Sequence, residues 1–251
     1  MPRRALPLAL LVLLVTAGCL GSSDDPAVRE DRAVETLESA NDAAAAVESY
    51  EFDVDIRVSA RTADGSEHYT ADGNGRVNVT ARTMAMETRT RGRPLESYVD
   101  GRTAYQACPP NGMHWGSHNV TADNWSSAAP LGRQLALLST GDLYYNGTET
   151  EDGREVVHLS GRPSLSALQD RSEVGTTSLP DADRIERLEL HAWFDAETQR
   201  LIRSRFSATA AGNGQEASVT LRMRFHDYGV PVDVTVPDDA RDAFSDGGCP
   251  G

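Results

Sequence analysis

The side chains best suited to chemistry in this sequence are three cysteines and six histidines. Cys108, His114 and His118 lie close enough along the chain to suggest metal ligands. Pro109 and Pro110 place them in a loop, however, so their spacing does not bring them to one face of a helix. The other four histidines lie on separate predicted strands, where we expect them to be solvated: His68, His158, His191 and His226. The pattern predicts no metal and no cofactor.

The usual catalytic motifs are missing from the sequence. It contains no Gly-x-Ser-x-Gly turn, no phosphate-binding loop, no His-Glu-x-x-His pair and no dinucleotide fingerprint. Aspartate and glutamate number 38 of 251 residues, so two carboxylates near one cleft carry little weight as a catalytic pair. We therefore expect a protein that is not an enzyme.

An N-terminal export signal is expected directly before Cys19. Arg3 and Arg4 precede an apolar run at 5–15 and small residues at 16–18, as in a secretory signal peptide. The run is too short to cross a bilayer, which needs roughly 20 apolar residues. Small residues directly before a cysteine resemble the lipobox of prokaryotic lipoproteins, in which the sulfur is alkylated by a diacylglycerol-type lipid.

The lipobox resemblance implies a signal peptide at 1–18, a lipidated Cys19 and a polar, flexible tether at 19–27. The protein would then be anchored in the cell membrane and face the extracellular side. In the alternative, an ordinary signal is cleaved and Cys19 stays unmodified. Arg3 and Arg4 are compatible with both the twin-arginine and the general export route.

Cys108 and Cys249 are the two cysteines that remain. In an oxidising extracellular setting an even pair usually forms a bridge, although two free thiols are the alternative. The bridge would close a loop of about 140 residues, for which chain entropy gives about 5 kcal/mol at most. It would also hold in place the Gly/Pro-rich tail at 241–251.

Four asparagines open an N-x-Ser/Thr sequon, which makes them candidates for N-glycosylation in an exported protein. These candidates are Asn78, Asn119, Asn124 and Asn146.

The chain is acidic, with a formal net charge of −14, and all 24 of its basic residues are arginine. This excess argues against nucleic acid and anionic lipid surfaces as partners. An acidic, lysine-free, Ala/Asp/Thr-rich composition resembles the products of haloarchaeal genomes. A bacterium of high GC content is the alternative.

Hydrophobic periodicity predicts one long helix at 28–48, followed by many strands. Residues 50–60 alternate apolar and polar without interruption, as in a long strand with one solvated face. A short helix is expected at 131–139, with irregular segments at 108–130 and 163–182. Further strands are expected at 68–80, 83–90, 94–100, 102–107, 142–149, 154–161, 188–194, 200–210 and 217–225, with a last edge strand at 230–236.

Four segments resemble the lipoprotein-carrier superfamily, which includes LolA-like carriers and mycobacterial lipid-transfer lipoproteins. They are Tyr50-x-Phe-x-Val, the hairpin from Tyr98 to Tyr105, the segment from Trp193 to Leu201, and the segment from Phe225 to Val232. The resemblance covers residues 28–240. It implies a mainly β (α+β) fold: a single strongly curved, unclosed antiparallel sheet of about eleven strands, wrapped over the long N-terminal helix and one or two short helices.

The same resemblance implies an apolar cavity between sheet and helices, which would hold a lipid or another apolar ligand. Its candidate lining residues are Tyr50, Phe52, Val54, Ile56, Met84, Met86, Leu190, Met223 and Phe225. In the alternative, the sheet packs its own inner face, the core is filled and no ligand binds. An envelope sensing protein with a membrane-protein partner would then be the function.

Overall fold

A computed structural model describes residues 27–63, 65–108, 114–120, 125, 129–165, 184–212, 214–242 and 244–245, with the side chains of the last two excepted. The signal at 1–18, Cys19 and nearly all of the tether lie outside these residues. No helix within the described ranges is long and apolar enough to span a membrane.

Long strands dominate the chain, because most of it alternates apolar and polar side chains. The helices are α1 (Asp31–Ala45), α3 (Pro130–Leu138) and α5 (Asp238–Arg241). The strands are β1 (Ser49–Thr62), β2 (Gly65–Asn78), β3 (Thr83–Thr90), β4 (Arg93–Asp100), β5 (Thr103–Ala107), β6 (Trp115–Asn119), β7 (Asp142–Glu151), β8 (Arg154–Arg162), β9 (Ile185–Asp195), β10 (Leu201–Gly212), β11 (Gln215–His226) and β12 (Phe244–Ser245).

All of these strands belong to one sheet, in the order β12-β6-β5-β4-β3-β2-β1-β11-β10-β9-β8-β7. Eleven of them pair antiparallel, and the two-residue β12 pairs parallel with β6. The sheet is open, with β12 and β7 at its two ends. The expected mainly β fold with an unclosed antiparallel sheet is confirmed.

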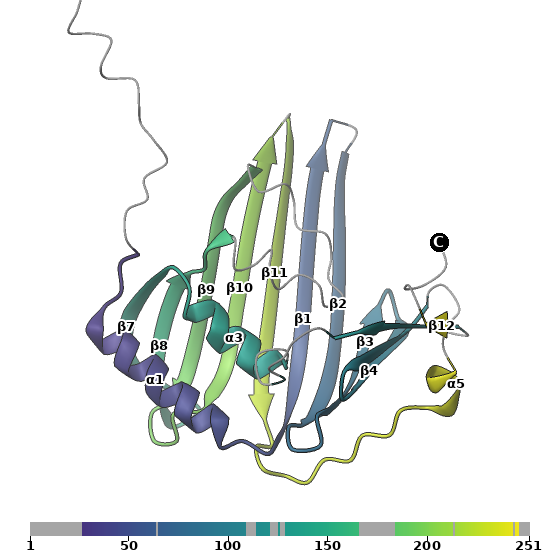
Figure 1. Cartoon of the computed structure of the whole chain (residues 1–251). Coiled ribbons are helices and arrows are strands. Elements are labelled where there is room, and N and C mark those ends of the chain that lie inside the picture. Colours follow the sequence, from purple (N-terminus) through teal and green to yellow (C-terminus); the bar gives the residue numbers. More distant parts are fainter. Residues whose placement is uncertain are drawn as a thin grey trace, which may run out of the picture.

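The expected edge strand at 230–236 is wrong. Residues 227–237 form an irregular segment, here called the C-terminal strap, which runs from the end of β11 below the sheet to α5 (Figure 1). Ser49 anchors it by donating its hydroxyl to the Val230 carbonyl at 2.6 Å, and Asn78 donates to the Val232 carbonyl at 2.9 Å. Val232 and Val236 are buried while Val230 is exposed, so the alternation reflects anchoring and not strand pairing.

Strand β6 lies inside the segment that we expected to be irregular. Its residues, from Trp115 to Asn119, lack apolar alternation, yet they pair antiparallel with β5. The side chain of Trp115 is buried with Ala107, Val236 and Ala240 in a small cluster at this end of the sheet. Its indole N–H donates to Asp239 at 3.1 Å, which ties β6 to α5, directly after the strap.

The main hydrophobic core lies on one face of the sheet, together with α1 and α3 (Figure 1). Helix α1 contributes Ala33, Leu37 and Ala40, and α3 contributes four buried leucines. We call this side the inner face and the opposite side the outer face. The upper ends of β1, β2, β10 and β11 extend beyond both helices (Figure 1).

Candidate functional site

The nine predicted cavity residues come together on the inner face. They belong to strands β1, β3, β9 and β11 and join one hydrophobic cluster with α1 and α3. Three of them are only partly buried, namely Ile56, Met84 and Met86. The other six are buried: Tyr50, Phe52, Val54, Leu190, Met223 and Phe225.

The lower part of this face is filled by aromatic side chains. The rings of Tyr50 and Phe225 lie 6.0 Å apart, and Phe52 lies 6.5 Å from Phe225. The Leu131 backbone N–H donates to the Tyr50 hydroxyl at 3.2 Å, and the Tyr228 hydroxyl donates to the Leu201 carbonyl at 2.6 Å. Burial raises the pKa of both tyrosines above its ordinary value, so both hydroxyls stay neutral.

A glycine on β2 makes room for one of these rings. A Cβ atom placed on Gly75 would meet the edge of the Phe52 ring and would lie 2.9 Å from the Ala85 carbonyl oxygen. The edge of the Phe52 ring therefore approaches the β2 backbone at Gly75, where any larger residue would displace it. The inner face is closely packed at this level.

Above this level the inner face opens. Apolar side chains in the same phase of β1, β9 and β11 are only partly buried, and the described residues place no helix over them. We call them the open patch: Ile56, Val58, Leu188, Val219 and Leu221. Strand register joins four of these residues, because Ile56 pairs with Leu221 and Val58 pairs with Val219. Leu188 lies one strand further on, since the buried Ala208 of β10 pairs with both Val219 and Leu188.

A buried polar side chain lies at the border between the filled part and the open patch. Gln134 on α3 is 3% exposed, and its amide nitrogen lies 3.7 Å from the sulfur of Met223. Its amide oxygen has no hydrogen-bond partner among the described residues. On β11, Met223 lies next to the open patch, because the neighbouring side chain on the inner face is that of Leu221. Sequence reasoning missed Gln134, which lies in a short leucine-rich helix.

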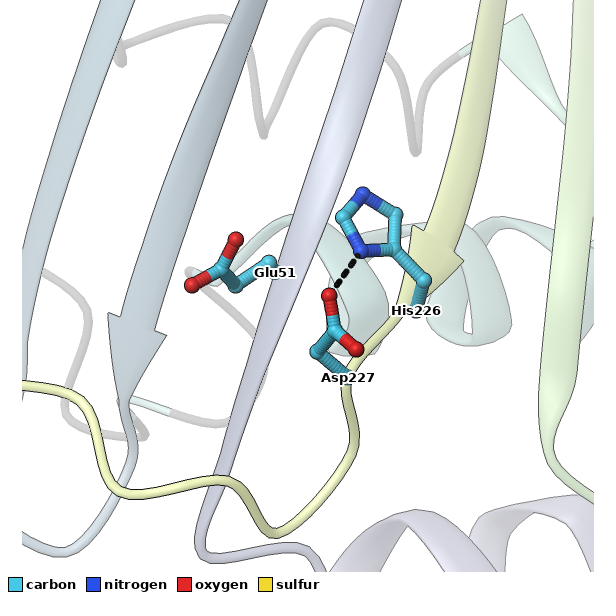
Figure 2. A group of neighbouring side chains, drawn as sticks. All are labelled: Glu51, His226 and Asp227. Carbon is cyan, nitrogen blue, oxygen red and sulfur yellow. Dashed lines mark hydrogen bonds and ion pairs between the residues drawn. The ribbon is translucent and has the colours of Figure 1, made fainter.

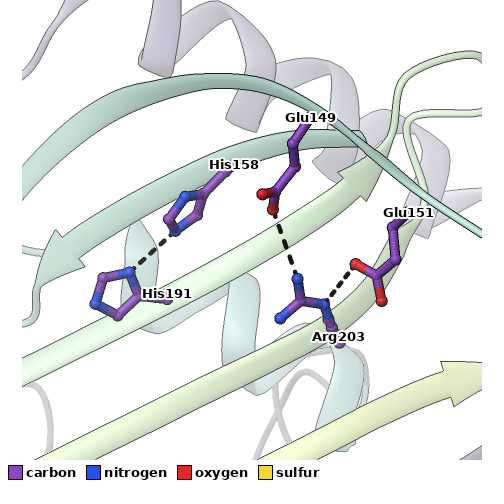
Figure 3. Close-up of polar contacts among 5 residues, drawn as sticks. All are labelled: Glu149, Glu151, His158, His191 and Arg203. Carbon is purple, nitrogen blue, oxygen red and sulfur yellow. Dashed lines mark hydrogen bonds and ion pairs between the residues drawn. The ribbon is translucent and has the colours of Figure 1, made fainter. Parts of the chain in front are cut away.

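The outer face carries a stacked cluster on β8, β9 and β10 (Figure 3). The rings of His158 and Trp193 stack at 4.4 Å, and Arg203 lies 3.7 Å from the Trp193 ring centre. The Nε2 atom of His158 and the Nδ1 atom of His191 are 3.0 Å apart. Arg203 also forms ion pairs with Glu149 at 3.5 Å and with Glu151 at 2.8 Å.

These two histidines lie on separate strands, as expected, but the expectation that they are simply solvated is wrong for this pair. His158 and His191 are half-buried and in contact, because the β8–β9 register sets them diagonally across two strands. Burial lowers the pKa of both imidazoles, and the neighbouring His191 lowers that of His158 further. At neutral pH both rings are uncharged, and one donates a hydrogen bond to the other.

A second outer-face cluster lies at the lower ends of β1 and β11 (Figure 2). Glu51, His226 and Asp227 bring one ligand-type atom each within 4.8 Å of the others. The two ring nitrogens of His226 already face carboxylates, with Asp227 at 2.7 Å and Asp53 at 3.5 Å. All four side chains remain in contact with solvent, which suits a surface ion-pair cluster.

The candidate modification sites differ in their surroundings. Asn119 and Asn146 are exposed. Asn78 uses both atoms of its amide within the fold, because it donates to the Val232 carbonyl at 2.9 Å and accepts from the Ala81 N–H at 2.8 Å. Asn124 lies outside the described residues.

One of the three cysteines lies within the described residues. Cys108 is 4% exposed and follows β5 directly. Cys19 and Cys249 lie outside the described residues, so the lipid anchor and the disulfide both stay predictions.

No family model and no curated protein matches the chain. Among solved structures, lipoprotein LppX from Mycobacterium tuberculosis matches with 17% identity over 82% of this chain and 100% of its own, at a TM-score of 0.49. LprF from Mycobacterium bovis matches with 17% identity over 84% of this chain and 98% of its own, at 0.42. A LolA superfamily protein from Nitrosomonas europaea matches with 12% identity over 78% and 94%, at 0.26.

These structures are of the kinds that the sequence motifs led us to expect. Their names describe a lipoprotein and a LolA superfamily protein. At these TM-scores they carry no argument about a ligand or a partner.

Proposed function

We propose that this protein is a membrane-anchored extracellular lipoprotein that binds a lipid or another apolar molecule on the inner face of its sheet. The observation that supports this is the open patch, where apolar side chains continue the core upward but remain partly exposed. Binding of an apolar ligand to this surface is stabilised by about 0.8 kcal/mol for each CH₂ group that becomes buried. The sheet would curve over the ligand and the two helices.

The proposed anchor would hold the domain close to one membrane. The chain enters the fold at β7, where the Leu143 N–H donates to the Val28 carbonyl at 2.8 Å and the Val28 N–H donates to Asp142 at 2.8 Å. Between Cys19 and Val28 the tether spans at most about 30 Å when fully extended. Ligand exchange would therefore take place with the membrane that holds the anchor.

Lipid extraction and mass spectrometry test the binding function. We expect purified protein that has been delipidated and re-exposed to a membrane lipid extract to retain an apolar ligand in stoichiometric amount. Leu221→Asp places a charge in the open patch and should abolish retention. Val230→Asp places the same charge on the exposed strap, 47% exposed, and should leave retention unchanged.

Loss of ligand from both variants, or from neither, would contradict the assignment of binding to the open patch. If the unmodified protein retains no ligand at all, the filled-core alternative gains support. In that case a membrane protein that co-purifies in mild detergent would identify the protein as an envelope sensing component.

A separate experiment tests the anchor. Cys19→Ser should release the protein into the medium or leave its signal uncleaved, because the serine hydroxyl does not replace the thiol in lipid attachment. Unchanged retention in the membrane fraction would show that something other than Cys19 holds the protein there.

A further inference from the structure

The buried amide of Gln134 carries information about the chemistry of the bound molecule. Its oxygen is closed off from solvent and has no hydrogen-bond partner among the described residues, although the residue is only 3% exposed. A buried acceptor left without a donor is destabilising, because the hydrogen bond that it makes to water in the unfolded chain is not replaced. The described buried polar side chains number four, so this one is a rare feature of the core.

The orientation of the amide follows from its neighbour. The Met223 thioether, 3.7 Å from the Gln134 nitrogen, is a weak acceptor and has no proton to donate. The N–H group of the amide therefore faces the sulfur, and the carbonyl oxygen is the atom without a partner. The missing group is a hydrogen-bond donor.

The surroundings of Gln134 favour a donor carried by a ligand over a bound water. A buried water needs two to four polar partners. Described residues of neighbouring strands lie beside Met223 in one row across the sheet. In this row one polar side chain is buried, that of Ser204, the register partner of Met223. The flanking row partners Val54 and Ala192 are apolar and buried.

The side chain of Met223 contacts Gln134 and borders the open patch. Met223 is 8% exposed, and the next inward positions, Leu221 and Ile56, belong to the open patch. Methionine is unbranched and flexible, so its side chain can turn aside at little cost. A group that enters from the open patch and displaces this thioether then reaches the Gln134 amide.

We propose that Gln134 binds the hydroxyl of a ligand that is otherwise apolar. The inference rests on the proposed binding function and specifies its ligand class: long-chain alcohols, diacylglycerols or sterols, whose single hydroxyl lies at the buried end. A fatty-acid anion is disfavoured, because its carboxylate cannot donate a hydrogen bond and burial of its charge is costly. The apolar body of the ligand covers the open patch.

Matched probes test the proposal on the whole protein without its anchor lipid. Binding of 1-dodecanol is compared with binding of dodecyl methyl ether, which has the same chain and no donor. We expect unmodified protein to bind the alcohol about tenfold more tightly, which corresponds to about 1.4 kcal/mol, because the ether leaves the buried amide oxygen unpaired. This ratio requires no mutation.

Gln134→Met gives the second measurement, because methionine has a similar shape and lacks the acceptor. Its affinity ratio should fall to about one, with the affinity for the ether unchanged, and circular dichroism checks its fold. An equal affinity of unmodified protein for both probes, or an unchanged preference in Gln134→Met, overturns the proposal while apolar binding stands. Failure of both probes to bind overturns the binding function and the proposal together.

Discussion

Substitution of two leucines on one row of the sheet tests where the filled core ends. Leu190 and Leu221 are both register partners of Phe206, one on each side. Leu190 is 0% exposed, whereas Leu221 belongs to the open patch. Replacing each by alanine removes the same atoms from two surroundings, so that the chemistry of the substitution is matched.

The expected cost is larger at Leu190 than at Leu221. Leu190→Ala loses about 2.4 kcal/mol of burial at ~0.8 kcal/mol per carbon and leaves a closed cavity, which together bring the cost to about 3–5 kcal/mol. Leu221→Ala loses only part of that burial and leaves no closed cavity. Its free energy of unfolding should fall by about 1–2 kcal/mol.

Urea unfolding followed by tryptophan fluorescence and circular dichroism measures both costs, with a common m-value as the check of two-state behaviour. If Leu221→Ala costs as much as Leu190→Ala, the upper inner face is a packed core with no room for a ligand. That result would refute the reasoning behind the proposed function.

Three further outcomes are expected. Gly75→Ala should lower the free energy of unfolding by about 1–3 kcal/mol, because its methyl group overlaps the Phe52 ring and cannot be relieved by a flexible neighbour; a stability within 0.5 kcal/mol of the unmodified protein in urea would contradict that packing. The lowered pKa values of His158 and His191 mean that the unfolded chain binds more protons than the folded one, so this contribution to stability is present above about pH 6.5 and is lost as the pH falls through the folded pKa values. Thermal unfolding between pH 7 and 5 should therefore show a steeper loss in the unmodified protein than in His191→Gln, and equal slopes would count against the pair. Mass spectrometry of peptides from protein made in its own host should find no glycan on Asn78, because both atoms of its amide are hydrogen-bonded inside the fold. A glycan there would mean that these two hydrogen bonds open.

Strand periodicity could be predicted well from the sequence, because one face of each long strand is solvated and the other is not. The same periodicity misled at Val230–Val236, since an extended segment anchored at alternate residues buries its side chains as a strand does. Strand β6 gave no periodic signal. Its place depends on pairing with β5 and on burial of Trp115, both of which are tertiary effects.

The candidate site was predictable in composition and not in detail. The phase of β1 correctly placed Tyr50 and Phe52 on the inner face. Where packing ends and the open patch begins depends on the positions of α1 and α3, and no local pattern encodes these. The contact of His158 with His191 depends likewise on the register of β8 and β9, across 33 residues of chain.

The pairing of β1 with β11 determines when the protein can fold. This seam lies near the centre of the sheet, yet it joins Phe52 to Phe225, so it cannot form before the end of β11 has been synthesised. Such distant contacts close slowly, because the entropy of a long loop is lost before any contact forms. Until then, one side of β1 remains an unpaired edge, which is the form of a strand most prone to aggregation. The first half of this sheet must therefore be shielded until the last long strand is available.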